Sequence, residues 1–276
     1  MKIPPEPIIV SHLFPEVRAE LLRVLTSLSD EQWNAPTACA GWSVRDVAAH
    51  ILADDVGLLS SHRDHDGQHF NVNNYAELLT LINAQNDRWV QSARRISRRL
   101  LCAFLELTGT QWQDFVVTID PFSLGGPIGW KGSQPDPMWI HIARELTEFW
   151  MHHQHICEAA GISSLKEARY VHPVLSTFAH AFPHTYRDTD APADTLVKIV
   201  LTGAGGGTWH VLREAGGWTL YAETDLSPAS SVTMPADTAW RMFTKGIAPD
   251  VLRQQTLIEG QRALGEVALN TVAIIA

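Results

Sequence analysis

The chain has 276 residues, of which 45% are hydrophobic and 18% charged, and its formal net charge is −9 at pH 7 with histidine neutral. This length is generous for one compact core and suits two domains, and the composition is that of an ordinary soluble globular protein. The negative charge disfavours binding to nucleic acid or to an anionic membrane surface, so we expect neither as a partner.

Targeting and redox signals are few in this sequence. A basic N-terminal stretch followed by an apolar run is absent, and no apolar run reaches the roughly 18 residues of a membrane span, so we expect neither a signal peptide nor a membrane helix. The three cysteines, Cys39, Cys102 and Cys157, are widely spaced, unlike a disulfide framework or a zinc ribbon. We expect a cytoplasmic protein that binds small molecules, as a monomer or a small homo-oligomer.

Four helices are predicted in the N-terminal part. Apolar residues at helical spacing predict the first over 13–28 and the second over 44–59, where Ser43-Val44-Arg45-Asp46 has the form of an N-terminal capping box. The third is predicted over 75–107 and the fourth over 138–160, closed by Gly161. The histidine-rich stretch 61–74 is predicted to be a solvated loop, with a second metal site or a proton relay as the alternative. The stretch 109–137 is predicted to be a long connection.

The sequence pattern changes after Ser163. A helix is predicted over 171–186, strands over 195–201, 208–213, 218–223 and 231–234, and helices over 237–245 and 261–270. The glycines around 215–217 indicate a β-hairpin between the second and third strands. The predicted fold class is therefore α+β, with a four-helix bundle over residues 1–163 and a smaller α+β domain over 164–276.

One carboxylate and two histidines in the predicted helices have a metal-binding pattern. Glu148 and His152 are four residues apart, a spacing that stacks two side chains on one helix face, and His50 lies beside the apolar stripe of the second helix. Three protein ligands and one open position are typical of a catalytic zinc site. Glu145 and His155 share the face of Glu148 and His152, so we expect them to surround and support the ligands.

Each of these signals has a structural alternative when taken alone. A histidine near an apolar helix face is usually a hydrogen-bonded core residue, and the Glu-x-x-x-His spacing is common. His141 is a competing donor, whereas His153 points away from the shared face and is expected in solvent or in a supporting position. Cys39 precedes a helix N-terminus, which favours a reactive thiol, although a structural role is simpler. The combination favours the metal site, because a carboxylate inside a helix bundle is costly unless it is paired or metal-bound.

Two motifs accompany the candidate metal ligands. The first motif runs Trp33-x-x-Pro36-Thr37-x-Cys39-x-Gly41-Trp42-Ser43-Val44-Arg45-Asp46-Val47-x-x-His50-Ile51. The second motif is Glu148-x-Trp150-x-His152-x-Gln154. Both motifs resemble those of a known family, the mycothiol-dependent maleylpyruvate isomerases, and the stretch 217–246 is similar, more loosely, to the C-terminal domain found in many members.

The resemblance implies a DinB-like helical bundle, an α+β C-terminal domain and a zinc ion on His50, Glu148 and His152. It also implies an enzyme that uses a low-molecular-weight thiol such as mycothiol. The thiolate would add to a double bond of an anionic substrate such as maleylpyruvate, the bond would rotate, and loss of the thiol would leave the trans isomer. The ligand set itself would suit other divalent ions.

The sequence also departs from the family pattern. The family isomerase uses an arginine of its C-terminal domain, and the corresponding place here holds Lys245, with Arg241 four residues earlier, so these two are the substrate-binding candidates. His155 stands where members often have an acidic residue, so the surroundings of the metal differ. The alternatives are a metal-dependent thiol S-transferase or hydrolase and a non-catalytic metal- or ligand-binding protein.

Overall fold

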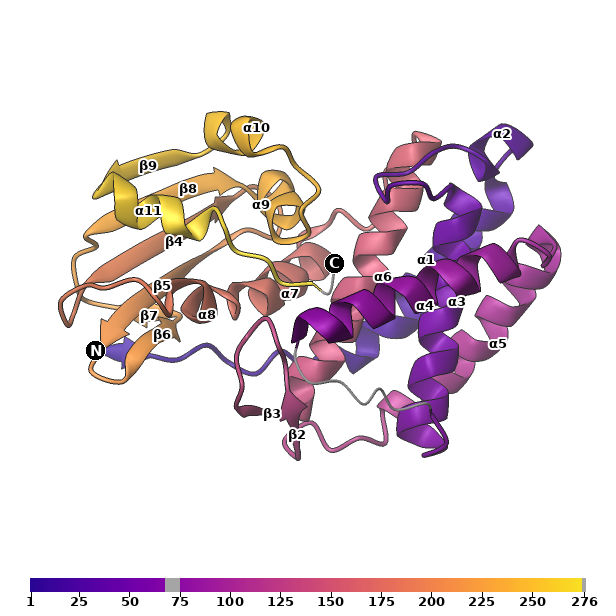
Figure 1. Ribbon diagram of the computed structural model, residues 1–276, viewed down its shortest axis with the longest axis horizontal. Coiled ribbons are helices and arrows are strands. Elements are labelled where there is room, and N and C mark those ends of the chain that lie inside the picture. Colours follow the sequence, from indigo (N-terminus) through magenta and orange to yellow (C-terminus); the bar gives the residue numbers. More distant parts are fainter. Residues whose placement is uncertain (68–74, 275–276) are drawn as a thin grey trace. The chain divides into compact units, whose positions relative to one another are not determined.

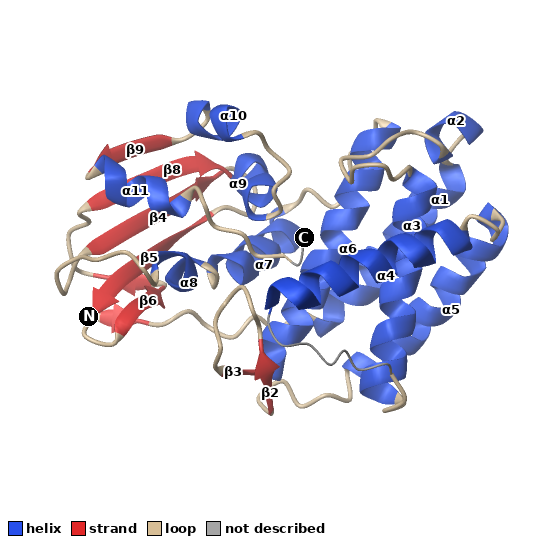
Figure 2. Ribbon diagram, viewed as in Figure 1, coloured by secondary structure: helices blue, strands red, loops and turns tan. Residues whose placement is uncertain are grey.

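The structure, a computed structural model, describes residues 1–67 and 75–274 (Figures 1 and 2). These residues form two compact units. Residues 9–122 and 144–165 make a helical unit, and residues 1–8, 123–143 and 166–275 make a unit that contains a β-sheet. The predicted α+β class is therefore confirmed. The division predicted after Ser163 lies near the change of unit at Leu165, while 1–8 and 123–143 group with the C-terminal part. The extent of the independently folding domains stays a prediction.

The helical unit is built from amphipathic helices whose apolar faces enclose a core. Val24, Val47, Ile51, Leu101 and Leu105 are fully buried in it. Its elements are η1 (Ser11–Leu13), α1 (Phe14–Ser27), α2 (Asp30–Trp33), α3 (Val44–Leu58), the π-helical turn η2 (Leu59–Arg63), α4 (Tyr75–Ala93), α5 (Arg98–Val116) and residues 144–160 of α6 (Met138–Ala160). The helices predicted over 13–28, 44–59 and 138–160 correspond to α1, α3 and α6.

The helix predicted over 75–107 is wrong, because α4 and α5 are separate helices. The hydroxyl of Ser97 accepts a hydrogen bond from the Leu100 N–H and caps the start of α5. The guanidinium of Arg45 donates to the carbonyl oxygens of Arg94 and Ile96, which satisfies backbone groups released at the break. The cap of Ser97 and the hydrogen bonds of Arg45 therefore separate the two helices, although the apolar pattern continues through the sequence.

The connection predicted from Gly109 is also shorter than expected, because α5 continues to Val116. Gly109 is tolerated inside the helix because Arg18 passes close to it: a Cβ atom there would lie 2.5 Å from Arg18 Nε. The connection then contains a short antiparallel pair, β2 (Leu124–Pro127) with β3 (Pro135–Pro137).

The sheet unit contains a five-stranded sheet in the order β6-β5-β4-β8-β9. Only the β4–β8 pair is parallel. The strands are β4 (Leu196–Thr202), β5 (Gly207–Glu214), β6 (Gly217–Tyr221), β8 (Ser230–Pro235) and β9 (Leu257–Gly260), and β1 (Lys2–Ile3) pairs with β7 (Glu223–Thr224). The predicted hairpin is confirmed, since Glu214 pairs with Gly217 across the turn.

Helices pack against this sheet (Figure 2), and its apolar side chains Val197, Val211 and Val232 are fully buried. The packed helices are α7 (Ala168–Ala179), α8 (Phe182–Tyr186), α9 (Ala236–Phe243) and α11 (Arg262–Ala268), and α10 (Pro249–Gln254) lies between α9 and β9 in the chain. The helix predicted over 171–186 is interrupted between α7 and α8, and neither α10 nor β9 was predicted. The four residues of β9 are too few to show a strand period, so only pairing with β8 identifies them.

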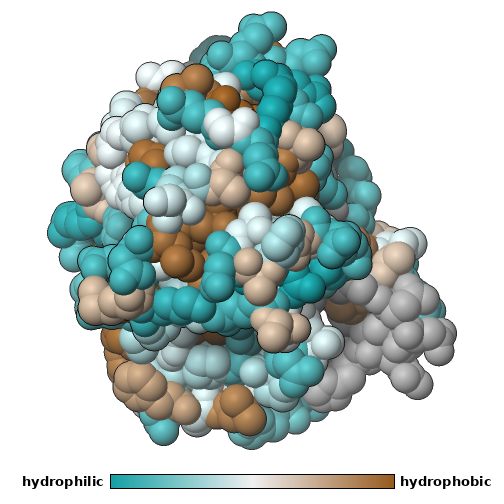
Figure 3. Space-filling model, turned by 90° about the vertical axis from the view of Figure 1, so that its left-hand side faces the viewer, coloured by the Kyte–Doolittle hydropathy of each residue, from teal (hydrophilic) through white to brown (hydrophobic). Residues whose placement is uncertain are grey.

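On the face shown in Figure 3, hydrophobic residues form small separate patches among hydrophilic ones. Within the described ranges, no helix combines the length and the apolar composition that crossing a bilayer requires.

Candidate metal centre

His50 is positioned by the start of α3. Ser43 and Asp46 form the predicted capping box, in which each side chain accepts a hydrogen bond from the other residue's backbone N–H. Arg94 donates to both carboxylate oxygens of Asp46 at 2.9 Å, which fixes the first turn of the helix. The ring of Trp42 packs 5.0 Å from that of His50, centroid to centroid. The imidazole is therefore held in one orientation.

The structure brings His50 and His152 together from two different helices. Their ring centroids lie 4.7 Å apart with an interplanar angle of 85°, and the two residues are only 7% and 6% exposed. About a hundred residues separate them in the sequence. Nothing in the local pattern of either helix specifies this contact, so it depends on how α3 packs against α6.

A carboxylate accompanies each histidine, one helical turn away on the same helix. Glu148 Oε2 lies 3.8 Å from His152 Nε2, as the spacing predicted. Asp54 Oδ2 lies 3.3 Å from His50 Nε2. One donor atom each from His50, Asp54 and His152 lies within 4.8 Å of the other two. The sequence reasoning missed Asp54, although the spacing that singled out Glu148 and His152 also joins His50 and Asp54.

Burial keeps both imidazoles neutral near pH 7. It lowers the pKa of His50 to about 4. It also lowers the pKa of His152 well below the ordinary value, with smaller contributions from the nearby His50 and His155. A neutral imidazole has a free lone pair, which is the form that binds a metal ion.

Burial raises the pKa values of the two carboxylates, whereas it lowers those of the two histidines. Burial, and then the negative charge of Glu145, raise the pKa of Glu148 to about 7, although Arg144 opposes the change. Burial, followed by Glu148 and Glu145, raises the pKa of Asp54 well above the ordinary value. The two side chains are still 26% and 30% exposed, so solvent reaches the carboxylates.

This donor set fits a divalent cation. The Nδ1 atoms of His50 and His152 are buried without a hydrogen-bond partner among the described residues. Without a bound ion this arrangement is unfavourable, because the buried nitrogens lack hydrogen-bond partners and the neighbouring carboxylates have raised pKa values. A bound cation would accept the lone pairs of the imidazoles and lower the pKa values of the carboxylates.

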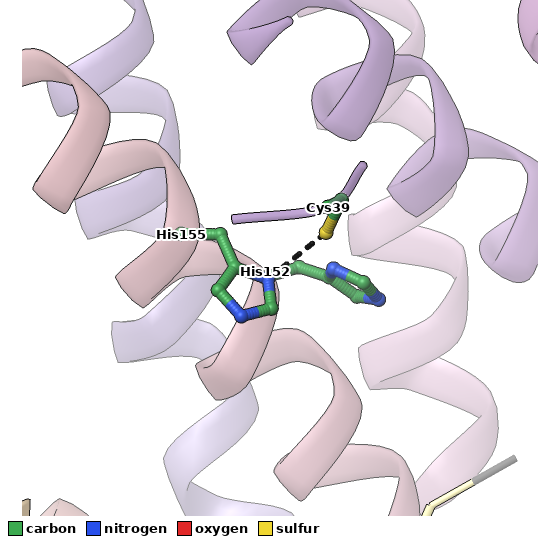
Figure 4. A group of neighbouring side chains, drawn as sticks. All are labelled: Cys39, His152 and His155. Carbon is green, nitrogen blue, oxygen red and sulfur yellow. Dashed lines mark hydrogen bonds between the residues drawn. The ribbon is translucent and has the colours of Figure 1, made fainter. Parts of the chain in front are cut away.

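The expected supporting residues lie near this set. Glu145 is buried and forms an ion pair with Arg144. His155 packs against His152, with ring centroids 5.5 Å apart, and its Nδ1 lies 3.2 Å from the sulfur of Cys39 (Figure 4). Burial raises the pKa of Cys39 to about 11, so the free thiol keeps its proton at neutral pH. This finding argues against a thiol activated by the helix N-terminus alone.

Other histidines of the sequence have different environments. His153 is fully buried, with Nε2 2.5 Å from Ser164 Oγ and 3.3 Å from Cys157 Sγ, so the expectation of solvent exposure was wrong. His141 Nε2 lies 3.0 Å from the carbonyl oxygen of Gly126. In the histidine-rich stretch, His62 and His65 are exposed and His69 lies outside the described residues.

Lys245 and Arg241 belong to the sheet unit. Arg241 forms an ion pair with Asp237 at 3.2 Å and lies over the ring of Trp240. Lys245 follows the C-cap of α9, Thr244, with φ of +57°, and lines a cavity of about 580 Å³ together with Arg253 and other residues of 242–272. The left-handed conformation is typical of a residue that terminates a helix. The role of both residues toward a substrate stays a prediction.

Comparisons with known proteins agree with this fold. The model of the mycothiol maleylpyruvate isomerase N-terminal domain matches residues 14–157, more than half of the chain. Two crystal structures are similar, one of the mycothiol-dependent maleylpyruvate isomerase and one of a histidine-to-alanine mutant of it. Each has a TM-score of 0.50 and 11% identity, and the match covers 84% of this chain and 86% of that chain. No curated protein matches the chain. By its N-terminal domain, the chain belongs to the mycothiol maleylpyruvate isomerase family.

Proposed function

We propose that this protein is a metal-dependent enzyme that works with a low-molecular-weight thiol. The contact between His50 and His152 carries the proposal: two buried, neutral imidazoles from α3 and α6 face each other, with carboxylates one turn away on each helix. Family membership supports the thiol, because mycothiol is named in the family's description.

His50, Glu148 and His152 would hold the cation, and Asp54 lies where it would join them or orient His50. Two imidazoles and a carboxylate suit Zn²⁺, which when bound would act as a Lewis acid that keeps a thiol sulfur deprotonated. The chain itself contributes the neutrality of the imidazoles, through burial, and the fixed orientation of His50 against Trp42. Asp54, whose Oδ2 lies 3.3 Å from His50 Nε2, is the carboxylate that would accept the proton that the thiol gives up.

The reaction that we propose is cis–trans isomerisation of maleylpyruvate or a similar anionic unsaturated substrate. The thiolate adds to the double bond, the resulting single bond rotates, and expulsion of the same thiolate restores the double bond, so nothing is consumed. The similar crystal structures favour this reaction by their names. Lys245 and Arg241 of the sheet unit remain the two candidates for binding the substrate carboxylate.

Metal analysis of purified protein tests the centre. His50→Ala, Glu148→Gln and His152→Ala should each weaken zinc binding, measured by mass spectrometry as the metal that the protein retains after removal of excess ion. His12→Ala, which changes an exposed histidine of the same unit, should keep it. Full metal content in all three site variants would overturn the proposal.

Turnover distinguishes the reactions. An isomerase converts maleylpyruvate only when mycothiol is present and leaves the free thiol concentration unchanged. A thiol S-transferase consumes the thiol and forms an adduct of higher mass. A hydrolase acts without thiol. A binding protein turns over nothing, although its melting temperature rises with ligand.

A further inference from the structure

A second group of metal donors shares His152 with the centre described above. One donor atom each from Cys39, His152 and His155 lies within 4.8 Å of the other two. Figure 4 shows the sulfur of Cys39 next to both imidazole rings. Cys39 has no role in the proposed isomerisation, and His155 enters it only by packing against His152.

The local fold holds the Cys39 sulfur against α6. The N–H of Cys39 donates to Thr37 Oγ1 at 3.2 Å, and the carbonyl oxygen of Cys39 accepts from the Trp42 N–H at 3.0 Å. The N–H of Thr37 donates back to the carbonyl oxygen of Trp42 at 3.0 Å. These bonds close the connector between α2 and α3 into a tight turn. His152 and His155 are three residues apart on α6 and present their rings to the same side.

The histidine that the two groups share has an unused nitrogen. Nε2 of His152 lies 3.8 Å from Glu148, whereas its Nδ1 is buried without a hydrogen-bond partner among the described residues. His152 and His155 are 6% and 7% exposed, and Cys39 is half-buried. A polar nitrogen that is this well buried needs a partner, and a cation in either donor group would supply one, so the two groups compete for His152.

We propose that Cys39, His152 and His155 form a second metal site, of thiophilic character, that competes with the carboxylate–histidine set for His152. One thiolate and two imidazoles select a soft or borderline ion such as Zn²⁺ or Cu⁺, whereas the carboxylates of the first set suit harder ions. Binding forms one metal–sulfur bond, and the thiol proton is released to solvent. The inference does not depend on the isomerase reaction.

Cobalt binding tests this site with a readout other than activity, because a thiolate ligand gives Co²⁺ an intense near-ultraviolet charge-transfer band. Titration of the zinc-free protein with Co²⁺ should produce this band. His50→Ala, which breaks the first set, should keep or strengthen it. Cys39→Ser should abolish it. Cys102→Ser, a change at another half-buried cysteine, should leave it intact.

A second measurement uses the unaltered chain, in case Cys39→Ser does not fold. Zn²⁺ should protect Cys39, but not Cys102, from alkylation by iodoacetamide, as located by peptide mass spectrometry. The proposal is overturned if the native protein and His50→Ala both lack the band at saturating Co²⁺, or if Zn²⁺ leaves the labelling of Cys39 unchanged. If His50→Ala loses zinc and also shows no thiolate band with Co²⁺, this result excludes the second site and supports the first.

Discussion

Two neighbouring aspartates on α3 belong to polar clusters of different kinds. Asp55 is fully buried, and each of its oxygens accepts a hydrogen bond of 2.6 Å, one from Arg18 Nη2 and one from Thr108 Oγ1. Asp54, one residue earlier, faces His50, and the Nδ1 atoms of His50 and His152 have no partner among the described residues. Both clusters are buried and polar, but only the carboxylate of Asp55 has its bonds supplied by the chain.

This difference separates a structural cluster from a ligand site. The Asp55 cluster ties α1 and α5 to α3, and its charges compensate each other within the protein. The Nδ1 atoms of the His50 and His152 cluster have no partner among the described residues, and a bound cation would supply one. The comparison therefore predicts opposite responses to mutation and to metal removal.

The largest effect is expected at the structural cluster. Arg18→Ala leaves the charge of Asp55 uncompensated in the core and should lower the free energy of unfolding by about 3–5 kcal/mol. Urea unfolding measures this loss. Arg23→Ala, which removes an exposed ion pair with Glu20, is the control and should cost less than about 1 kcal/mol. If both variants lost the same free energy of unfolding, the Asp55 cluster would not be the structural cluster that the comparison assumes.

Metal removal should act only on the ligand site. A chelator should lower the free energy of unfolding of the zinc-loaded protein by about 2.7–4.1 kcal/mol when the ion had been present at 100 to 1,000 times its Kd. In His152→Ala, which lacks the histidine common to both donor groups, the chelator should change nothing. Arg18→Ala should still respond to it. A chelator effect of the same size in His152→Ala would contradict the assignment.

Asp54 offers a finer test of the centre. Asp54→Asn keeps the shape of the side chain but removes its charge beside His50, so zinc affinity should fall about 10–100-fold. Competition with a chromophoric chelator gives the affinity. Glu6→Gln, a change of an exposed carboxylate, should leave it unchanged. An unaltered affinity in Asp54→Asn would restrict the centre to the three ligands predicted from the sequence.

The most gradual effect, spread over a range of pH, concerns a buried histidine outside both clusters. Burial lowers the pKa of His180 to about 4, and its Nε2 has no hydrogen-bond partner among the described residues. Its pKa is lower in the folded chain, so the unfolded chain binds the extra proton between pH 6.5 and 4. The stability contribution is therefore lost as pH falls through this window, by at most about 1.4 kcal/mol per pH unit.

His180→Gln should flatten this pH dependence in a series of urea unfolding curves. None of the three-donor groups in the described part of the chain includes His180, so a chelator should not affect this contribution. If metal removal changed it, an unpartnered nitrogen alone would be enough to mark a metal site, and the comparison of the two α3 clusters would need revision.

Prediction from the sequence succeeded where the signal was local. The α3 boundary followed from the capping box of Ser43 and Asp46, and α6 from its apolar spacing and Gly161. It failed at the break between α4 and α5, where Arg45 from another helix satisfies the freed carbonyl oxygens. The sequence of residues 75–107 alone cannot predict these hydrogen bonds, because their donor, Arg45, lies outside that stretch.

The sequence by itself determined the helices that carry His50, Glu148 and His152, because caps and apolar spacing are encoded within a few residues. It also determined membership of the family, through motifs that follow those same helices. Only the tertiary structure decided that His50 meets His152 and that Cys39 reaches His155. Those contacts join residues from distant parts of the chain, and their geometry is set by the packing of whole helices.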